Sequence, residues 1–291
     1  MTVAPARSGG PEEQHVDLHA HSTASDGSKS PTALVTAAKA AGLSAIALTD
    51  HDTMAGVSEA VSAGASLGIR VVPGVELSAI DEDREVHLLG LHVHRPNALQ
   101  DALQKFRERR HARALQIVSK LNGLAIPISF DDVLARAGDA AIGRPHIARA
   151  LIEGGWARDS RDAFDRYLGS GRPAFVAKYR LSVADAIALV HAGGGLAVLA
   201  HPGPDGRREI VERFVALGLD GLEVRHPGHT AEDTNRLGAL TAFLSLVPSG
   251  GSDWHGATEG PRVLGVMRVP TSWLEQQDSR VEARRAASML A

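Results

Sequence analysis

The stretch Val-Asp-Leu-His-Ala-His-Ser at residues 16–22 decides how this chain folds and what chemistry it offers. Its apolar character predicts a β-strand over residues 16–21, and residues two apart in a strand point to the same face. His19 and His21 would therefore present two parallel imidazoles at the end of a strand. Such a pair resembles half of a metal site, so further ligands should lie at the ends of other strands.

The composition is that of an ordinary globular protein. The 291 residues are 44% hydrophobic and 22% charged, with a net charge of -3, which suits one large α/β domain. No global basic field exists to attract long duplex nucleic acid, which we therefore do not expect as a partner. Cysteine is absent, so any metal would have to be held by His, Asp and Glu.

The ends of the chain carry no sign of a membrane. Residues 1–14 contain Pro, Ser, Gly and Glu but no apolar signal-peptide core, and we interpret them as a disordered leader. No apolar run approaches the roughly 20 residues of a membrane span. We therefore expect a cytoplasmic protein without a membrane partner.

Strand-like and helix-like segments alternate along most of the chain. The expected strands are 16–21, 44–49, 69–75, 85–93, 196–200, 221–224 and 245–247. The expected helices between them are 32–41, 57–67, 183–192, 209–217 and 231–243. Repeated βα units with short apolar strands predict a parallel sheet or barrel, which we assign to residues 15–96 and 181–274.

Residues 97–180 follow a different pattern, without convincing strand alternation. A long helix is expected at 99–121 and shorter ones at 145–153 and 161–168. We interpret 97–180 as a helical insertion subdomain inside a βα connection. Residues 275–291 are expected to form a C-terminal surface helix.

Nine ionisable side chains lie in, directly after or close behind the strand-like runs. They are His19, His21, Asp26, His51, Glu76, His87, His201, Asp253 and His255. Strand ends converge on one face of a βα barrel, where active sites are built. Nine ligands exceed the needs of one tetrahedral ion and fit two or three ions. Three dications against three carboxylates leave a positive surplus, which suits a phosphate dianion and a bridging hydroxide.

The ordered motifs resemble those of the PHP (polymerase and histidinol phosphatase) family over about residues 15–256. They are Asp17-Leu-His-Ala-His-Ser22, Thr49-Asp-His-Asp52, Gly74-Val-Glu-Leu-Ser78, His87, Ala200-His-Pro-Gly203 and Gly251-Ser-Asp-Trp-His255. The resemblance implies an α/β fold, a distorted (β/α)7 TIM-like barrel, with a trinuclear metal centre.

The resemblance also implies how the ligands are divided. His19, His21, Glu76 and Asp253 correspond to a first site. Glu76, His87 and His201 correspond to a second site, and Asp26, His51 and His255 to a third. Many family members have His where this chain has Asp26, and an oxygen ligand there favours Mn or Mg over Zn in that site. We expect three divalent ions, with Mn as first choice and Zn or Fe as alternatives.

Two motifs of the insert bear on the substrate. Gly143-Arg-Pro-His146 and Gly169-Ser-Gly-Arg-Pro173 resemble the subgroup acting on nucleotides, such as nucleoside 3′,5′-bisphosphate phosphatases. The same subgroup contains 5′→3′ exoribonuclease-like members. The expected enzyme is a metal-dependent phosphoesterase that hydrolyses a phosphomonoester of a small nucleotide by attack of a metal-bridged hydroxide. The alternatives are an exonuclease on short single-stranded RNA, a histidinol-phosphatase-like enzyme and a non-catalytic metal-binding scaffold.

A few further residues are candidates for binding and proton transfer. Phosphate is matched best by fixed cationic donors, and Arg144, Lys178 and Arg225 are the candidates, with surface salt bridges as the alternative for each. His229 is the candidate to protonate the leaving oxygen, although turn structure is the commoner explanation for a histidine in this position.

Three aspartates next to the ligand motifs also allow two interpretations. Asp17, Asp50 and Asp52 could orient ligand imidazoles, or they could cap helices and turns.

Overall fold

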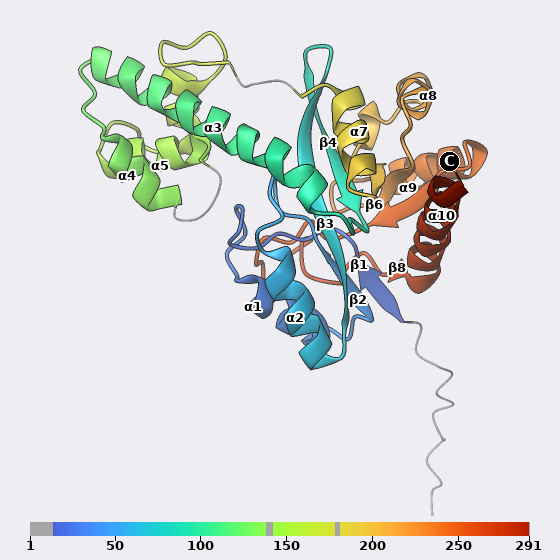
Figure 1. The fold of residues 1–291 in the computed structure, drawn as a ribbon. Helices are drawn as coiled ribbons and strands as arrows, with labels where there is room; N and C mark the ends of the chain where they lie inside the picture. The colour runs from blue at the N-terminus through green and yellow to red at the C-terminus, as the bar shows by residue number, and fades with distance from the viewer. Residues whose placement is uncertain (1–13, 138–141, 178–180, 291) are drawn as a thin grey trace, which may run out of the picture.

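The computed structural model describes residues 14–137, 142–177 and 181–290. An eight-stranded sheet in the order β7-β6-β5-β4-β3-β2-β1-β8 curls around the centre of the molecule (Figure 1). Its strands are β1 (His15–Asp17), β2 (Ala45–Leu48), β3 (Arg70–Asp81), β4 (Arg84–Leu91), β5 (Leu196–Leu199), β6 (Gly221–Arg225), β7 (Val247–Gly250) and β8 (Val269–Pro270). Backbone contacts between the first and seventh strands bring the sheet almost to closure. The Leu18 N–H donates to Gly250 O at 3.0 Å, and Ala20 bridges to Trp254. The expected distorted barrel is confirmed.

The sheet is mixed, where the sequence predicts a parallel one. β4 pairs antiparallel with both β3 and β5, because a tight turn at Glu82 and Asp83 replaces the helix that a parallel connection needs. β3 also continues past the expected end at residue 75 to Asp81. The reversal places the start of β4 at the end of the barrel where the parallel strands finish.

β1 is shorter than the expected strand at 16–21. The Asp17 carboxylate accepts hydrogen bonds from the backbone N–H groups of Ser252 (2.9 Å) and Gly265 (3.0 Å). The chain then leaves the regular ladder but stays extended as far as Ala20. His19 and His21 still lie on one side, with their ring centroids 5.2 Å apart.

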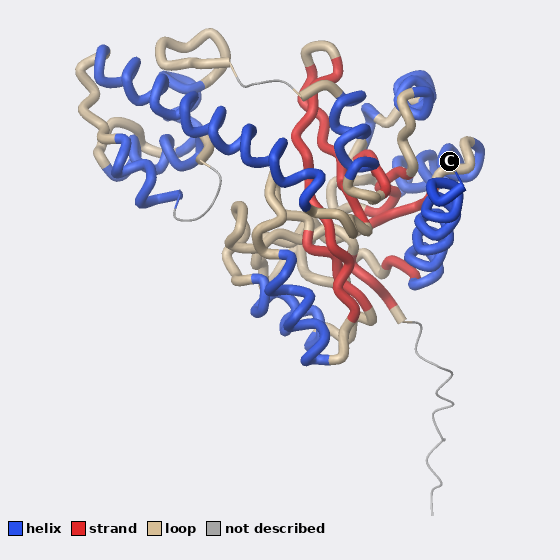
Figure 2. The backbone as a smooth tube through the Cα atoms, in the orientation of Figure 1, coloured by secondary structure: helices blue, strands red, loops and turns tan. Residues whose placement is uncertain are grey.

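Helices cover the outside of the barrel (Figure 2). They are α1 (Pro31–Ala40), α2 (Val57–Leu67), α7 (Val183–Ala192), α8 (Arg208–Ala216) and α9 (Ala231–Phe243), with a short 3₁₀ turn at Gly203–Asp205. The Ser30 hydroxyl caps α1 by accepting from the Ala33 N–H at 3.2 Å, and Pro31 takes the first helical position. Within the described residues, none of the helices is long and apolar enough to cross a membrane.

The C-terminal helix α10 (Thr271–Leu290) starts four residues earlier than expected, and part of one face is buried. Leu274 belongs to the apolar cluster formed by the barrel strands, and Val281 is also buried. The side chain of Gln277 is fully buried and donates to Pro248 O at 2.8 Å. The prediction of a surface helix is therefore wrong for the face that carries Leu274, Gln277 and Val281, because this face packs against the barrel.

The insert has an apolar cluster of its own. It comprises α3 (Asn97–Gly123), α4 (Phe130–Ala137), α5 (Arg144–Glu153), α6 (Ser160–Ala163) and a π-helical turn at Phe164–Leu168. Leu99 and Leu103 of α3 pack in the barrel-side cluster, whereas Ile117 and Leu121 pack in the insert's cluster. α3 thus extends from the barrel to α4 and α5 (Figure 1). The described part of this region thus has an apolar cluster separate from that of the barrel, and the bounds of the insert at 97–180 stay a prediction.

A buried carboxylate away from the strand ends gives a test of stability. Asp220 accepts from His191 Nε2 (2.8 Å), from Arg284 Nη1 (3.1 Å) and from the Ala197 N–H (2.9 Å), and it thereby joins α7, α10 and β5. Burial alone would raise the pKa of Asp220, but the hydrogen bonds of His191 and Arg284 hold it below its usual value. A lowered carboxyl pKa stabilises the fold above the unfolded-state pKa, and that contribution is lost as pH falls through the folded-state value.

We predict that Asp220→Asn lowers the free energy of unfolding by roughly 1–3 kcal/mol at pH 7. The difference from wild type should shrink as pH falls below about 4, the usual aspartate pKa. Urea denaturation of the metal-free protein across this range measures it. The control is Asp165→Asn, because Asp165 is 66% exposed; equal effects at the two positions would contradict the prediction.

Candidate metal centre

The nine predicted ligands converge at one end of the barrel. His19, His21 and Asp26 follow β1, His51 follows β2, and His201 follows β5. Asp253 and His255 follow β7, whereas Glu76 and His87 lie inside β3 and β4. His87 reaches the same end because β4 is antiparallel. Every one of the nine has a side-chain nitrogen or oxygen within 3.8 Å of another member.

The carboxylate of Glu76 is the centre of this group. It is 1% exposed, and five imidazoles surround it. The distances from Glu76 oxygens are 3.4 Å to His19 Nε2, 3.3 Å to His21 Nε2, 3.1 Å to His51 Nδ1, 2.9 Å to His87 Nδ1 and 3.0 Å to His201 Nε2. A parallel bridge between His51 and Glu76 fixes the backbone on either side.

The first implied site corresponds to a compact group. Ligand atoms of His19, His21 and Glu76 lie within 4.8 Å of one another. Asp253 Oδ1 adds a second carboxylate, 3.5 Å from His19 Nε2 and 3.2 Å from His21 Nε2. Two imidazoles and two carboxylates make a donor set that a divalent transition metal accepts.

The second implied site shares Glu76 with the first. Glu76 Oε1 lies between His87 Nδ1 and His201 Nε2, at 2.9 Å and 3.0 Å. Ligand atoms of His51, Glu76 and His87 also lie within 4.8 Å of one another. His51, which the family resemblance assigns to the third site, therefore also lies close to the residues of the second site.

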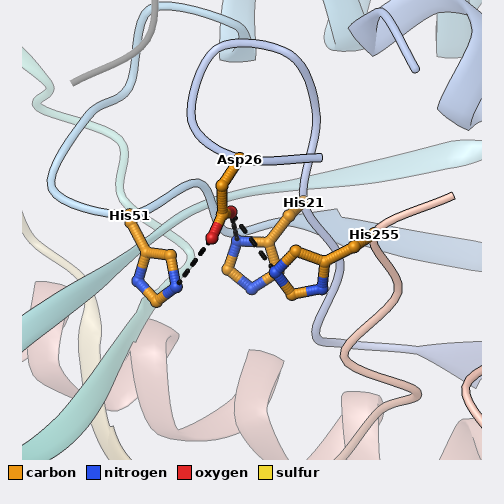
Figure 3. Close-up of side chains that lie close together, drawn as sticks. All are labelled: His21, Asp26, His51 and His255. Carbon is orange, nitrogen blue, oxygen red and sulfur yellow. Dashed lines mark ion pairs between the residues drawn. The ribbon is translucent and has the colours of Figure 1, made fainter. Parts of the chain in front are cut away.

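The third group surrounds Asp26, as Figure 3 shows. Asp26 oxygens lie 3.2 Å from His255 Nε2, 3.8 Å from His51 Nε2 and 3.8 Å from His21 Nδ1. All four residues offer ligand atoms within 4.8 Å of one another. The structure thus adds His21 to the three residues that the family resemblance implies.

Buried polar atoms test whether metal ions fit these groups. Among the described residues, His19 Nε2, both ring nitrogens of His21 and His51 Nδ1 are buried and make no hydrogen bond. An unsatisfied buried nitrogen costs about 1–3 kcal/mol, and a metal ion would satisfy it. The nitrogens face carboxylates, so the donor set fits divalent cations.

The charges inside the cluster are strongly coupled. Burial would raise the pKa of Glu76, but His19 and His51 hold it well below its usual value. Burial opposes protonation of His21, yet the nearby carboxylates of Asp253 and Glu76 raise its pKa to about 9. Burial and the charges of His21 and His87 lower the pKa of His51 to about 4, despite the nearby Glu76. Five imidazoles around one carboxylate cannot all be protonated.

Glu223 of β6 is a functional candidate that the sequence analysis missed. It is fully buried, and Oε1 accepts from His19 Nδ1 at 3.0 Å while Oε2 accepts from the His201 N–H at 2.6 Å. It thereby leaves Nε2 of His19 pointing towards Glu76. The available signal was a charged residue inside the apolar run Gly221-Leu-Glu-Val-Arg225.

The three aspartates next to the motifs hold loops instead of ligand imidazoles. Asp17 binds backbone N–H groups across the barrel seam. Asp50 accepts from the Ser22 N–H and hydroxyl, both at 2.7 Å, and Asp52 accepts from the Ser78 N–H and pairs with Arg110. Their hydrogen bonds therefore support the capping interpretation.

Two of the predicted ligands have strained backbone conformations. His201 and Asp253 have φ of 30° and 50°, in the left-handed region that few residues other than glycine adopt. Such residues persist where the surrounding structure enforces them, and they cluster at functional sites. Here they turn the chain at the ends of β5 and β7.

His229 lies beside the cluster, but both ring nitrogens are engaged. Nε2 accepts from the Gly203 N–H at 3.1 Å, so Nδ1 carries the proton and donates to Val224 O at 3.0 Å. Burial lowers the pKa of His229. These contacts favour the turn interpretation over proton donation.

The three predicted phosphate-binding residues have different surroundings. Arg144 begins α5, donates to Leu168 O at 3.3 Å and lies over the Phe164 ring. Arg225 donates to the carbonyls of Met267 and Arg268 and stacks on Trp273, so the structure does not bring it into the cluster. Lys178 lies outside the described residues.

Arginines from other parts of the chain lie nearer to the ligands. Arg110 of α3 donates to Asp52, which follows His51 directly. Arg262 pairs with Asp253 and lines a cavity of about 520 Å³ together with His51, His87, His201 and His255. The sequence offered no motif for either arginine, because Arg110 lies 58 residues from Asp52 and no local pattern marks the contact of Arg262 with Asp253.

Comparisons with known proteins agree with this arrangement. A model of the PHP domain matches residues 17–168. A 5′-3′ exoribonuclease of Haemophilus influenzae is 40% identical over 245 residues, which cover 82% of this chain and 89% of that protein. A 3′,5′-nucleoside bisphosphate phosphatase of Chromobacterium violaceum is 36% identical over 258 residues, covering 86% and 90%. The crystal structure of a predicted metal-dependent phosphoesterase from Bifidobacterium adolescentis superposes with a TM-score of 0.79 at 34% identity, covering 93% of this chain and 98% of that one.

The barrel and its cluster define the class as metal-dependent enzymes that hydrolyse phosphoesters. Within that class, this chain belongs to the PHP family.

Glu223 offers a test of how the cluster is held together. We predict that Glu223→Gln weakens metal affinity by about 10–100-fold, because the ligand imidazole loses a charged partner. Chelator competition measures the affinity, and urea denaturation of the metal-free protein separates this effect from a general loss of stability. Glu232→Gln, at an exposed position of α9, is the control. Unchanged metal affinity in Glu223→Gln would show that Glu223 has no part in positioning the ligands.

Proposed function

We propose that this chain hydrolyses a phosphomonoester of a small nucleotide, the 3′-phosphate of a nucleoside 3′,5′-bisphosphate. The observation that carries the proposal is the Glu76-centred cluster, with orphaned imidazole nitrogens, beside arginines at the junction of barrel and insert. The cluster with its metal ions would bind the phosphate that is cleaved, and the arginines would bind the other phosphate. The relative named for this activity supports the assignment.

We propose that three divalent ions occupy the cluster, with Mn as first choice and Zn or Fe as alternatives. His19, His21, Glu76 and Asp253 would hold one, and Glu76, His87 and His201 another. Asp26, His51 and His255 would hold the third, with His21 close by. Bound divalent cations make water more acidic and neutralise phosphoryl charge.

The chain's own residues would orient the substrate. Arg262 at the cavity edge is 45% exposed and pairs with Asp253, so it adds positive charge where a phosphoryl group would lie. Glu223 would hold the His19 ring and the His201 backbone in place through the two hydrogen bonds described above. The hydrogen bonds of Asp17 and Asp50 hold the loops at this end of the barrel in place, and a site that is already arranged needs little reorganisation during the reaction.

The second phosphate would lie against Arg110, Arg113 and Arg144. Burial and the positive charges of Arg144 and Arg110 lower the pKa of Arg113 to about 10. Three guanidinium groups close enough to repel one another form a favourable site for a dianion, which relieves the repulsion. Arg110 connects this group to the metal cluster through Asp52.

A second candidate function is 5′→3′ exonuclease action on short single-stranded RNA. The relative that is 40% identical and named a 5′-3′ exoribonuclease supports it. The two activities break the same kind of bond, so one cluster could perform both. They differ in products, since the exonuclease releases mononucleotides and the phosphatase releases inorganic phosphate.

The proposed phosphatase activity has a direct test. The Mn-loaded protein should release inorganic phosphate from a nucleoside 3′,5′-bisphosphate. Asp26→Ala combined with His201→Ala should abolish turnover and lower the metal content of the purified protein, because each change removes a ligand. Asp101→Ala, at an exposed position of α3, is the control. A fully active double variant would contradict the assignment.

The arginine group predicts a substrate-dependent effect. Arg113→Gln should raise the KM for the bisphosphate about tenfold, equivalent to about 1.4 kcal/mol. The KM for a nucleoside 3′-monophosphate should stay the same, because that substrate lacks the second phosphate. Steady-state kinetics on both substrates measures this, with Lys105→Gln on the exposed side of α3 as control. An equal rise in KM for both substrates would contradict the proposal that the arginine group binds the 5′-phosphate.

A further inference from the structure

The turn between β6 and α9 carries two histidines that the function proposed above does not use. Its sequence is His226-Pro-Gly-His229, and the His229 N–H closes the turn by donating to His226 O at 2.9 Å. Both histidines line the cavity beside the metal cluster. The side chain of His226 is only 5% exposed, so its ring nitrogens need partners within the protein.

These partners determine which nitrogen of His226 carries the proton. Nδ1 lies 3.0 Å from the backbone nitrogen of Gly228, and a backbone N–H can only donate. Nδ1 is therefore the acceptor, and the proton of the neutral ring is on Nε2. That nitrogen lies 3.4 Å from Asp253 Oδ2 and donates to it. The turn thus directs a hydrogen-bond donor at a predicted metal ligand.

The two carboxylate oxygens of Asp253 face different groups. Oδ1 lies 3.5 Å from His19 Nε2 and 3.2 Å from His21 Nε2, which belong to the first predicted metal site. Oδ2 accepts hydrogen bonds from His226 and Arg262. Both donors therefore hold Oδ2, and Oδ1 remains available to an ion.

The two donors to Oδ2 differ in exposure. Arg262 is 45% exposed, and under the proposed function it lies where a phosphoryl group would bind. A phosphate would compete with Asp253 for this guanidinium group, because arginine donates to either anion. His226 is buried and held by Gly228. Its hydrogen bond to Asp253 would therefore persist when a substrate binds.

His229 anchors the turn that carries His226. Its ring nitrogens bind the backbone of Gly203 and Val224, as described above, so the turn is fixed at both of its ends. Asp253 has a φ of 50°, a strained conformation that its surroundings must enforce. The hydrogen bond from the fixed His226 ring is one of the contacts that enforce it.

We propose that His226 is a positioning residue for the metal centre. It holds Asp253 so that Oδ1 faces the ion of the first site, also while Arg262 binds the substrate. The inference rests on the proposed function, because it requires an ion beside Asp253. It predicts that loss of the donor weakens the binding of one ion and leaves the other ions in place.

The test removes or replaces the donor and measures the bound ions directly. His226→Leu and His226→Phe lose the N–H group, whereas His226→Gln retains one. The metal-free proteins are titrated with Mn, and electron paramagnetic resonance of the free ion gives the number and affinity of the bound ions. One ion should bind about 10–100-fold more weakly in both His226→Leu and His226→Phe, because a metal ligand loses its hydrogen-bond partner. His226→Gln should bind every ion as tightly as the wild type.

Two further variants and a rate measurement complete the test. His94→Leu makes the same change at an exposed histidine outside the cavity and should leave Mn binding unchanged. Arg262→Gln removes the other donor to Asp253 and should not weaken any ion, because His226 remains. At low Mn the donor-free variants should hydrolyse the bisphosphate more slowly than the wild type, and saturating Mn should restore their kcat.

The contrary results are equally specific. Wild-type Mn affinities in His226→Leu and His226→Phe would overturn the inference. An equal loss of all ions, together with a lower free energy of unfolding of the metal-free variants, would also overturn it, since that result indicates a purely structural role. So would Arg262→Gln if it weakened the same ion as much as His226→Leu. A wild type that binds Mn but releases no phosphate from the bisphosphate would contradict the proposed function alone, because the Mn titration does not depend on turnover.

Discussion

The buried carboxylate of Glu76 is the constraint on which the rest of the site depends. Five imidazoles from four different segments lie within 3.4 Å of its two oxygens. Burying a carboxylate is costly unless cations compensate it. The imidazoles cannot all be charged together, so metal ions are the natural counter-charge. The surrounding loops, including the strained turns at His201 and Asp253, hold the histidines around this one residue.

The barrel topology makes this convergence possible. Parallel strands deliver residues at their carboxyl ends, and the reversed strand β4 delivers His87 from its beginning. The reversal also leaves the start of β4 without a strand partner on the β5 side, and this edge forms one wall of a cavity of about 480 Å³ that Val86, Ile210 and Phe214 line. The same departure from a regular (β/α) repeat thus completes the metal cluster and opens space beside it.

Local patterns in the sequence predicted a parallel sheet or barrel, and the resemblance to the PHP family specified the distorted barrel. The patterns also identified the nine candidate ligands, because each of them lies in or close behind a short apolar run. They could not show the direction of β4, since its turn at Glu82 and Asp83 lacks the usual hairpin residues. Glu223 was missed because its partners, His19 and His201, lie 204 and 22 residues away. Arg110 was missed for the same reason, because Asp52 lies 58 residues before it. Arg262 lies only 9 residues after Asp253, but no local motif marks it. Arg225 shows the opposite error. It was predicted to bind phosphate because of its residue type, but its side chain packs on Trp273, outside the cluster.

Anomalous diffraction from crystals grown with Mn would test most directly whether Glu76 is shared between metal ions. We expect three peaks, with Glu76 as a ligand to two of them and Asp26 as a ligand to the third. A single peak away from Glu76, or an ordered Glu76 carboxylate without any ion beside it at saturating Mn, would contradict it.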